Sequence, residues 1–294
     1  MNKKKILASV SSNIGAFRKI NQDNFYLNGV MLQSNTEPHF TCSRGFSNGV
    51  FAVADGMGGE SYGEFASMVT MVTLGECCKA KKLNGSEGVK SFVDMANSQI
   101  CQKMLETNSK IGTTVALAIV KRNKVRVYNV GDSRCMLYRK GQLIQLSKDH
   151  TVVAHLVECN LLTPEQAKTD KRRHQLSQHV GIFPEDMEIS IYESPEFSLQ
   201  NDDIILICTD GVTDSLDENT IIKLIKKNPR MQQLTNDLVY RAIENGSKDN
   251  ATAIAIQCCK DTKDFLKRVI WILGGLCAVV CGVLSGLLTL QFLL

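Results

Sequence analysis

The chain has 294 residues, 44% of them hydrophobic and 22% charged, with a net charge of +4 at pH 7. This length and apolar content are typical of one folded domain of ~200–250 residues with an appendage, and the short, scattered basic runs argue against a nucleic-acid partner. The eleven cysteines are an odd number and show no Cys-x-x-Cys spacing, so they indicate neither a disulfide framework nor a zinc site and fit free thiols in a reducing cytoplasm.

Apolar β-rich runs and apolar residues at helical spacing alternate along the first 258 residues. The β-rich runs predict strands at 5–10, 49–54, 113–120, 124–130, 134–139, 142–146, 187–192, 203–209 and 250–257. Helical spacing predicts two long helices at 62–82 and 88–108, and shorter ones near 152–158, 219–227 and 231–244. Because short turns join several strands into hairpins, antiparallel sheets covered by helices are favoured over a doubly wound parallel sheet.

The strand at 49–54 runs into a glycine-rich turn, Asp55-Gly56-Met57-Gly58-Gly59. A dinucleotide site or a P-loop would need a different glycine spacing, and the P-loop would also need a lysine. Here the aspartate comes first, so the turn is better suited to a divalent cation than to a phosphate group.

Aspartates recur at the ends of the predicted strands, each beside a glycine, serine or asparagine. They are Asp23, Asp55, Asp132, Asp210 and Asp249. Clustered carboxylates repel one another and raise each other's pKa unless a cation neutralises them. A carboxylate-rich site with few histidines selects Mg²⁺ or Mn²⁺ over zinc, and a pair of such ions can hold a water for hydrolysis of a phosphate ester.

Residues 269–294 differ from the rest of the chain because these 26 residues carry no charge. A helix of this length can cross a hydrocarbon core of ~30 Å, so the sequence predicts a transmembrane helix. Basic residues are concentrated in the preceding segment, 259–268, which places the domain at 1–258 on the cytoplasmic side of a single-pass membrane protein. Gly282-x-x-x-Gly286 predicts a weak dimer through this helix.

Six motifs occur in order along residues 5–258: RKINQD, VADGMGG, GTTVALA, VGDSR, TDGVTD and SKDNAT. Together they resemble the bacterial form of the metal-dependent type 2C (PPM) family of protein serine/threonine phosphatases. The resemblance implies an α+β fold, a four-layer αββα sandwich of two antiparallel β-sheets flanked by helices. It also implies a site for two Mn²⁺ or Mg²⁺ ions, with room for a third, at one end of the sandwich.

The same resemblance assigns the metal ligands. Asp55 would bridge two metals, and the carbonyl of Gly56 would bind one of them. Asp210 and Asp249 would complete the shell of the other metal, and Asp132 with Asp210 matches the position of a third metal in bacterial members.

The remaining roles concern substrate and water. Arg18 matches the arginine that binds the substrate phosphate. Asp23 would hold a metal-bound water, and Gln22 stands beside it where some members have a glutamate. Asp55, Asp23 and Arg18 would thus carry the catalysis: in-line attack of a metal-bridged water on phosphoserine or phosphothreonine, without a phosphoenzyme.

Two other features bear on the mechanism. Met57 stands where animal members have a histidine that is a candidate general acid, so the leaving group must take its proton from a metal-bound water, from solvent or from a side chain such as His150. Residues 163–181, which include Lys171, Arg172 and Arg173, fall where the family has a variable flap beside the metal channel; they are called the flap segment below.

The expected partners are phosphorylated proteins, with the substrates of a membrane serine/threonine kinase as candidates, and the membrane itself. Tethering would raise the local concentration of such substrates. Two alternatives remain open on the sequence: a membrane-tethered pseudophosphatase that binds phosphoproteins as a scaffold, and a phosphatase of small molecules with the same site.

Overall fold

The structure, a computed structural model, describes residues 5–58 and 62–258. The predicted basic segment at 259–268 and the predicted transmembrane helix at 269–294 lie outside these residues. Within the described ranges, no helix combines the length and the apolar character needed to cross a bilayer. The membrane span, its orientation and the dimer through its glycines therefore stay predictions.

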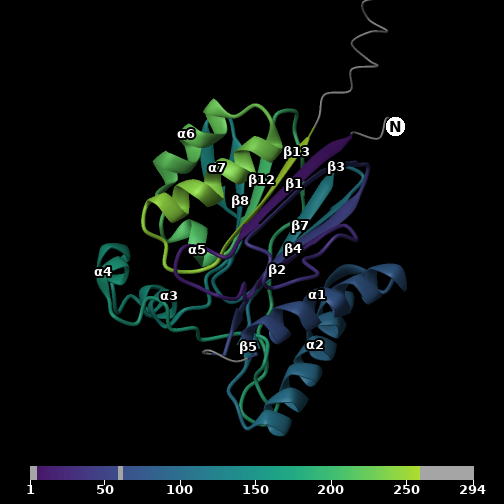
Figure 1. The fold of residues 1–294 in the computed structure, drawn as a ribbon, viewed down its shortest axis with the longest axis vertical. Helices are drawn as coiled ribbons and strands as arrows, with labels where there is room; N and C mark the ends of the chain where they lie inside the picture. The colour runs from purple at the N-terminus through teal and green to yellow at the C-terminus, as the bar shows by residue number, and fades with distance from the viewer. Residues whose placement is uncertain (1–4, 59–61, 259–294) are drawn as a thin grey trace, which may run out of the picture. The chain divides into compact units, whose positions relative to one another are not determined.

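Two antiparallel sheets stack on each other in the middle of the domain (Figure 1). The first has six strands in the order β3-β1-β13-β12-β8-β9. Their bounds are β1 Ile6–Asn13, β3 His39–Phe46, β8 Arg134–Arg139, β9 Gln142–Gln145, β12 Ile204–Cys208 and β13 Ala251–Cys258. The pairing of β1 with β13 joins the two ends of the described chain within one sheet.

The second sheet has seven strands, with the path β10-β7-β6-β4-β2 and with β11 beside β7 and β5 beside β4. Their bounds are β2 Asp23–Leu27, β4 Gly49–Met57, β5 Gly112–Thr113, β6 Val115–Lys121, β7 Lys124–Val130, β10 Tyr192–Glu193 and β11 Phe197–Ser198. The short β5 extends the pairing of β4 past Asp55, so that Gly56 lies opposite Thr113.

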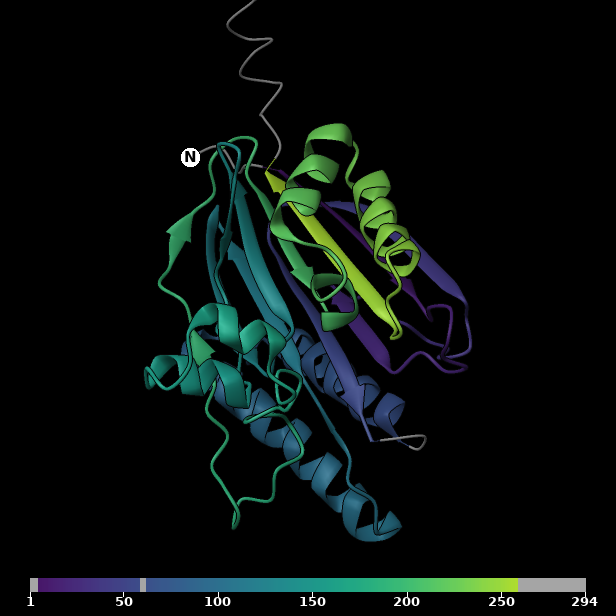
Figure 2. The same ribbon diagram turned by 90° about the vertical axis from the view of Figure 1, so that its left-hand side faces the viewer.

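Helices cover the outer face of each sheet, as the two views show (Figures 1 and 2). On the seven-stranded sheet lie α1 Gly63–Lys79 and α2 Gly85–Thr107. On the six-stranded sheet lie α5 Asp210–Thr213, α6 Glu218–Lys227 and α7 Met231–Glu244. Two short helices, α3 Val152–Glu158 and α4 Pro164–Thr169, stand to the side of these layers. The α+β architecture of two antiparallel sheets flanked by helices is thus confirmed.

Three apolar clusters hold the four layers together. The middle cluster contains Phe25 and Phe51 from one sheet and Ile205 from the other. A second cluster joins α1 and α2 to the seven-stranded sheet, and a third joins α5, α6 and α7 to the six-stranded sheet. Strand β12 contributes to two of them, since Ile205 faces the middle cluster and Leu206 faces the helices. Burial on both faces explains why this strand reads as an unbroken apolar run in the sequence.

Two of the differences between the structure and the predicted strands have a clear physical cause. The predicted strand at 187–192 is wrong, because only Tyr192 of that run lies in a strand, the two-residue β10. The alternation in this run arises because Ile189 and Ile191 pack on the cluster beneath α1 and α2 without pairing in a ladder. Strand β3 was not predicted; it is a sheet edge whose residues are mostly half-buried, so its two faces carry no clear polar and apolar alternation.

Candidate active site

Asp23 and Asp55 lie side by side at one end of the sandwich. They are opposite each other in the antiparallel pairing of β2 with β4. Two threonines fix the backbone around Asp55: its N–H donates to the Thr114 hydroxyl at 3.1 Å, and its carbonyl accepts from the Thr113 hydroxyl at 2.8 Å. The position of Asp55 therefore depends on neighbouring strands and not on its own turn alone.

The Asp23 carboxylate is buried and only half satisfied. Its Oδ2 accepts hydrogen bonds from the hydroxyls of Thr209 at 2.8 Å and Thr252 at 2.7 Å. Its Oδ1 is buried and has no hydrogen-bond partner among the described residues. Burial raises the pKa of Asp23 to about 8, against the opposing effect of the two threonine hydroxyls. A buried carboxylate oxygen without a donor is costly unless a cation or a water meets it.

Asp210 brings a third carboxylate to the same place from the other sheet. It begins α5 directly after β12, and its Oδ1 is also buried without a partner among the described residues. Burial raises the pKa of Asp210 and raises that of Asp55 well above its usual range. After burial, the charge of Asp210 is the main cause of the Asp55 shift, so these two carboxylates are close enough to repel when both are ionised.

Asp132 borders this cluster from the loop between β7 and β8. Burial raises its pKa to about 8, and the charges of Asp210, Asp149 and Asp214 add to the effect. The loop is held by His150: its ring Nδ1 accepts from the Gly131 N–H at 3.3 Å, and its backbone N–H donates to the Gly131 carbonyl at 2.9 Å. His150 is buried, and burial lowers its pKa. Its bonds to Gly131 support the loop that carries Asp132.

Asp249 and Arg18 form an ion pair at the rim of the cluster. Arg18 donates from one terminal nitrogen to Asp249 Oδ2 at 2.7 Å, and both side chains are about two-fifths exposed, at 43% and 39%. Asp249 directly precedes Asn250, whose side-chain amide donates to the carbonyls of Ile14 and Ile20. These bonds fix the loop that carries Arg18 against the loop that carries Asp249. The predicted phosphate-binding arginine is thus at the site, where it contacts a predicted metal ligand.

Gly56 occupies a position that admits no side chain. A Cβ added there would overlap the Gly63 carbonyl and would lie 2.7 Å from the Gln22 carbonyl oxygen. The Gly56 N–H donates to that Gln22 carbonyl at 3.0 Å, and the Gln22 N–H donates to Asn250 Oδ1 at 2.8 Å. The backbone of Gly56, the residue after Asp55, is thus held in place by Gly63 and Gln22, as a ligand carbonyl would require.

The donor set fits divalent cations. Carboxylates from both sheets converge here, and two of their oxygens are buried without partners in the described part of the chain. Burial raises the pKa values of Asp23, Asp55, Asp132 and Asp210. Such a group is unfavourable as ionised carboxylates alone and becomes favourable when hard cations supply the compensating charge. Oxygen ligands of this kind suit Mg²⁺ and Mn²⁺.

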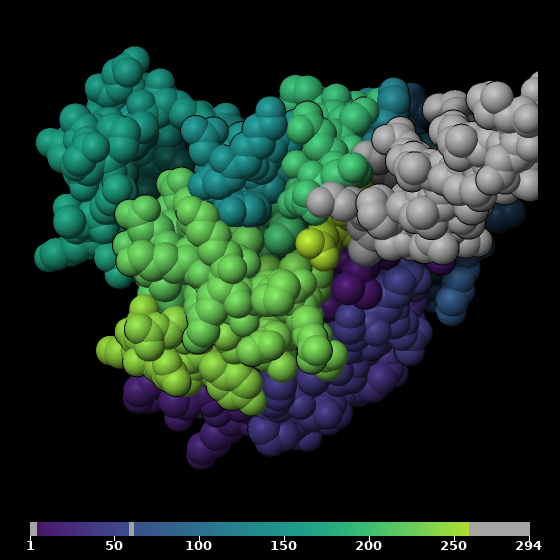
Figure 3. All heavy atoms as spheres, turned by 90° about the horizontal axis from the view of Figure 1, so that it is seen from above, coloured from purple at the N-terminus to yellow at the C-terminus, as the bar shows by residue number. Residues whose placement is uncertain are grey.

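A cleft of about 1160 Å³ opens beside the cluster and is lined by Asp132 and Asp210. The flap segment forms one wall with α3, and residues from α5 to the start of α6 form the other. In the space-filling view, the teal surface of α3 and α4 stands apart from the green surface of the helices on the six-stranded sheet (Figure 3). The cleft is large enough for an extended peptide segment.

Two residues of this cleft were not predicted. Asp214, at the end of α5, lies one helical turn after Asp210, and His174 of the flap segment places Nδ1 3.0 Å from Asp214 Oδ2. The spacing of four in TDGVTD indicated that both aspartates share a helix face. No pattern in the variable flap segment distinguishes His174 from a solvent-exposed histidine.

Comparison with known proteins gives a consistent result. Residues 39–245 match the family model described as Protein phosphatase 2C. The serine/threonine phosphatase stp of Listeria welshimeri is 27% identical over 251 residues, which is 83% of this chain and 92% of that protein. The serine/threonine protein phosphatase PstP of Mycobacterium tuberculosis is 28% identical over 230 residues, which is 77% of this chain and 42% of that longer protein.

Solved structures agree with the fold. The crystal structure of the Mycobacterium tuberculosis serine/threonine phosphatase PstP/Ppp superposes with a TM-score of 0.72 at 25% identity, covering 87% of this chain and all, 100%, of that one. The catalytic domain of PstP in complex with two manganese ions gives 0.69 at 25% identity over 87% and 100% of the two chains. Stp1 from Staphylococcus aureus gives 0.71 at 27% identity over 85% and 94%.

Proposed function

Because this chain belongs to the protein phosphatase 2C family of serine/threonine phosphatases, we propose that it hydrolyses phosphoserine and phosphothreonine in proteins with Mn²⁺ or Mg²⁺ as cofactor. The observation that carries the proposal is the carboxylate cluster of Asp23, Asp55 and Asp210, in which one oxygen of Asp23 and one of Asp210 are buried without partners among the described residues. The solved PstP catalytic domain with two manganese ions supports the choice of metal.

Each residue of the cluster has a distinct task in this proposal. Asp55, the Gly56 carbonyl, Asp210 and Asp249 would hold the two cations. When bound, these cations supply an activated water and neutralise the charge of the phosphate. Asp23 orients the attacking water through Oδ1, since its Oδ2 is already held by Thr209 and Thr252.

Arg18 binds the substrate phosphate at the rim. Its guanidinium can take two phosphate oxygens at once, a geometry that a lysine cannot match. To do so it must release Asp249, and the exposure of this ion pair makes the exchange inexpensive because exposed pairs contribute little stability. Asp249 is then free to act as a metal ligand, so binding of metal and of phosphate are mutually supporting.

A thiol mechanism is not needed and has no support at the site. Cys208, the cysteine that precedes TDGVTD, is fully buried at the end of β12, and burial raises the pKa of its thiol to about 12. A thiol of that kind is protonated at neutral pH and is a poor nucleophile. Direct hydrolysis by water therefore accounts for the chemistry without a phosphoenzyme.

The proposal includes the membrane. The uncharged run at 269–294, preceded by basic residues, supports a single-pass anchor that keeps the catalytic domain at the cytoplasmic face. Phosphoproteins at that membrane, including substrates of a membrane serine/threonine kinase, would then be the natural substrates.

The deciding experiment is hydrolysis of a phosphothreonine peptide by the purified full chain in detergent, with EDTA, Mg²⁺ or Mn²⁺. We expect turnover only with metal, and a loss of at least about 100-fold in Asp55→Ala and Asp210→Ala, because removing one preorganised charge-stabilising group costs about this much. Asp186→Asn, an exposed surface aspartate, is the matched control and should retain full activity. A folded protein that shows no turnover with any metal would refute the enzyme and favour the phosphoprotein-binding scaffold.

A further inference from the structure

We propose that His174, Asp210 and Asp214 bind an additional divalent cation through one imidazole nitrogen and two carboxylates, and that this ion fastens the flap segment to the catalytic cluster. The inference rests on the proposed function, since it extends the same metal site toward the cleft. It assigns a specific task to a residue of the variable flap segment.

The geometry of the three side chains carries the proposal. Each offers one ligand atom, and these atoms all lie within 4.8 Å of one another. His174 Nδ1 and Asp214 Oδ2 are 3.0 Å apart. Asp210 adds a second observation, because its Oδ1 is buried without a hydrogen-bond partner among the described residues. A cation between the three would compensate the charge of this carboxylate.

This ligand set differs from the one predicted from the sequence. The prediction paired Asp132 with Asp210 for a third metal. Asp132 does border the cluster, since the charges of Asp210 and Asp214 act on it. The tight group of ligand atoms, however, joins Asp210 to Asp214 and to the flap segment. The chain therefore has a nitrogen ligand where the sequence predicted only oxygen.

The hydrogen bonds of His174 show what cation binding must change. Arg173 Nε–H donates to His174 Nε2 at 2.7 Å. That bond leaves the ring proton on Nδ1, where it is donated to Asp214. A cation at Nδ1 takes the place of this proton, which moves to Nε2, and Arg173 must then release the ring. Binding of the ion thus removes one of the two hydrogen bonds of the Arg173 guanidinium, which lines the cleft and still donates to the Lys168 carbonyl at 3.2 Å.

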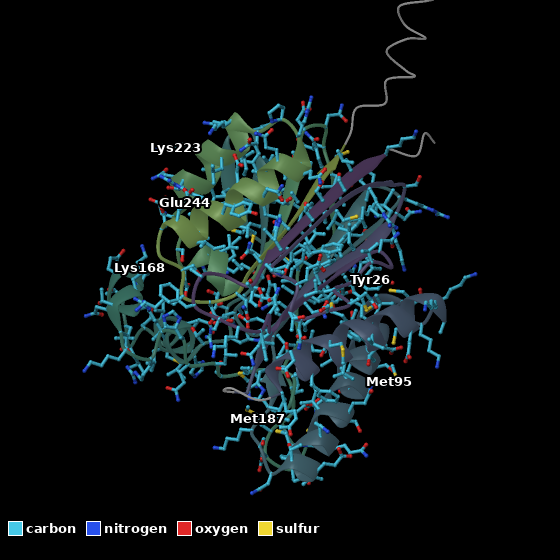
Figure 4. All side chains as sticks on the ribbon, in the orientation of Figure 1. Tyr26, Met95, Lys168, Met187, Lys223 and Glu244 are labelled. Carbon is cyan, nitrogen blue, oxygen red and sulfur yellow. The ribbon has the colours of Figure 1, made fainter. Side chains whose placement is uncertain are left out.

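The position of His174 in the chain makes it an effective attachment point. The residues directly after it are anchored to the domain by backbone bonds: the Val152 N–H donates to the Gln175 carbonyl at 2.8 Å, and the Ser177 N–H donates to the His150 carbonyl at 2.9 Å. His174 is the next residue outward from this anchor. An ion held by His174 would add one more attachment point to the flap segment, on the side toward α4, where Lys168 is labelled in Figure 4.

The ligand chemistry predicts selectivity among metals. An imidazole suits transition-metal ions, whereas Mg²⁺ prefers oxygen ligands and keeps its waters. Mn²⁺ accepts both kinds of ligand. The additional site should therefore fill with Mn²⁺ and remain empty with Mg²⁺ at the same concentration.

The test is Mn²⁺ binding to the full chain in detergent, followed by calorimetry and by pulsed electron paramagnetic resonance, which detects coupling of bound Mn²⁺ to imidazole ¹⁴N. We expect an additional, weaker Mn²⁺ site that shows nitrogen coupling. In His174→Ala the nitrogen coupling should vanish and the affinity of that site should fall at least about tenfold, since even indirect supports of a metal are worth that much. His155→Ala, a histidine on α3 away from the group, should leave both unchanged.

A second readout follows the flap segment itself. Trypsin can cleave at Lys171, Arg172 and Arg173, which are exposed. Mn²⁺ should slow cleavage there in the wild type and in His155→Ala, but not in His174→Ala, and Mg²⁺ should protect less. Equal Mn²⁺ stoichiometry and equal protection in wild type and His174→Ala, with no nitrogen coupling, would overturn the inference. Neither readout depends on turnover. A chain that is inactive but shows the Mn²⁺ site with nitrogen coupling would therefore refute the proposed function and leave this inference standing.

Discussion

At the scale of single residues, Asp23 is the clearest sign of a site built for charge compensation. A buried aspartate normally has both oxygens satisfied by donors, whereas this one has donors on Oδ2 and none on Oδ1 among the described residues. Because the carboxylate is held so that one oxygen stays open, its orientation is fixed before any ligand arrives. Preorganisation of this kind is what a hydrolytic site needs.

The raised pKa of Asp23, about 8 against 3.8 for an unperturbed aspartate, predicts how metal-free stability depends on pH. The folded state binds the proton more tightly than the unfolded state, so the contribution of Asp23 to stability is fully present below about pH 3.8 and is lost as pH rises through about 8. In EDTA, the denaturant midpoint of the full chain should therefore be higher at pH 6 than at pH 8.5. Urea titrations monitored by far-ultraviolet circular dichroism would measure this midpoint.

Two comparisons give this prediction its control. Saturating Mn²⁺ should flatten or reverse the pH dependence, because a cation favours the ionised carboxylate. Asp23→Asn, which cannot ionise, should also weaken the dependence in EDTA. A midpoint that rises from pH 6 to pH 8.5 in EDTA would contradict the assigned direction of the shift.

At the scale of elements, the sequence could predict those parts of the site that follow from strand ends. Asp55 and Asp210 were predictable because each follows an apolar run, and the structure places both in the cluster. His174 was not predictable, because it comes from a loop whose path depends on backbone bonds to distant residues such as Val152. The error at 187–192 has the same origin: alternation records burial, and a loop packed on helices can bury alternate residues as a strand does.

The contact between β4 and the start of α1 predicts the cost of a side chain at Gly56. In Gly56→Ala the new methyl group would overlap the Gly63 carbonyl, so β4 and α1 must separate. We expect a loss of about 1–3 kcal/mol in the free energy of unfolding, as for other overpacked sites. Because the Gly56 backbone would move with it, metal affinity should fall as well.

Gly246→Ala is a suitable control for this prediction. That glycine has a positive φ of 92° but open space around it, so the substitution brings backbone strain without a clash. It should reduce stability and leave metal affinity unchanged. Chemical denaturation and Mn²⁺ titration of both variants would separate the two effects, and an unaltered metal affinity in Gly56→Ala would count against Gly56 as part of the metal site.

At the scale of the whole molecule, the uncharged run at 269–294 and the basic segment before it predict that the protein is bound to a membrane. If residues 269–294 anchor the protein, the full chain should float with lipid vesicles in a density gradient, and it should need detergent, not salt, for release. Replacing two central residues of the run, Val279→Arg and Val280→Arg, should abolish flotation, because charges at the bilayer centre are costly. Val269→Ala at its edge is the matched control. Flotation that survives both arginines would exclude this run as the anchor.

The cluster draws its carboxylates from both sheets, and this has a consequence during synthesis of the protein. Asp23 and Asp55 belong to the seven-stranded sheet, while Asp249 lies two residues before β13, which pairs with β1 from the other end of the described domain. A nascent chain on the ribosome therefore lacks a complete set of ligands until β13 has emerged. Products truncated before Asp249 would therefore lack this residue and the strand that closes the six-stranded sheet onto β1, and they should show no phosphatase activity.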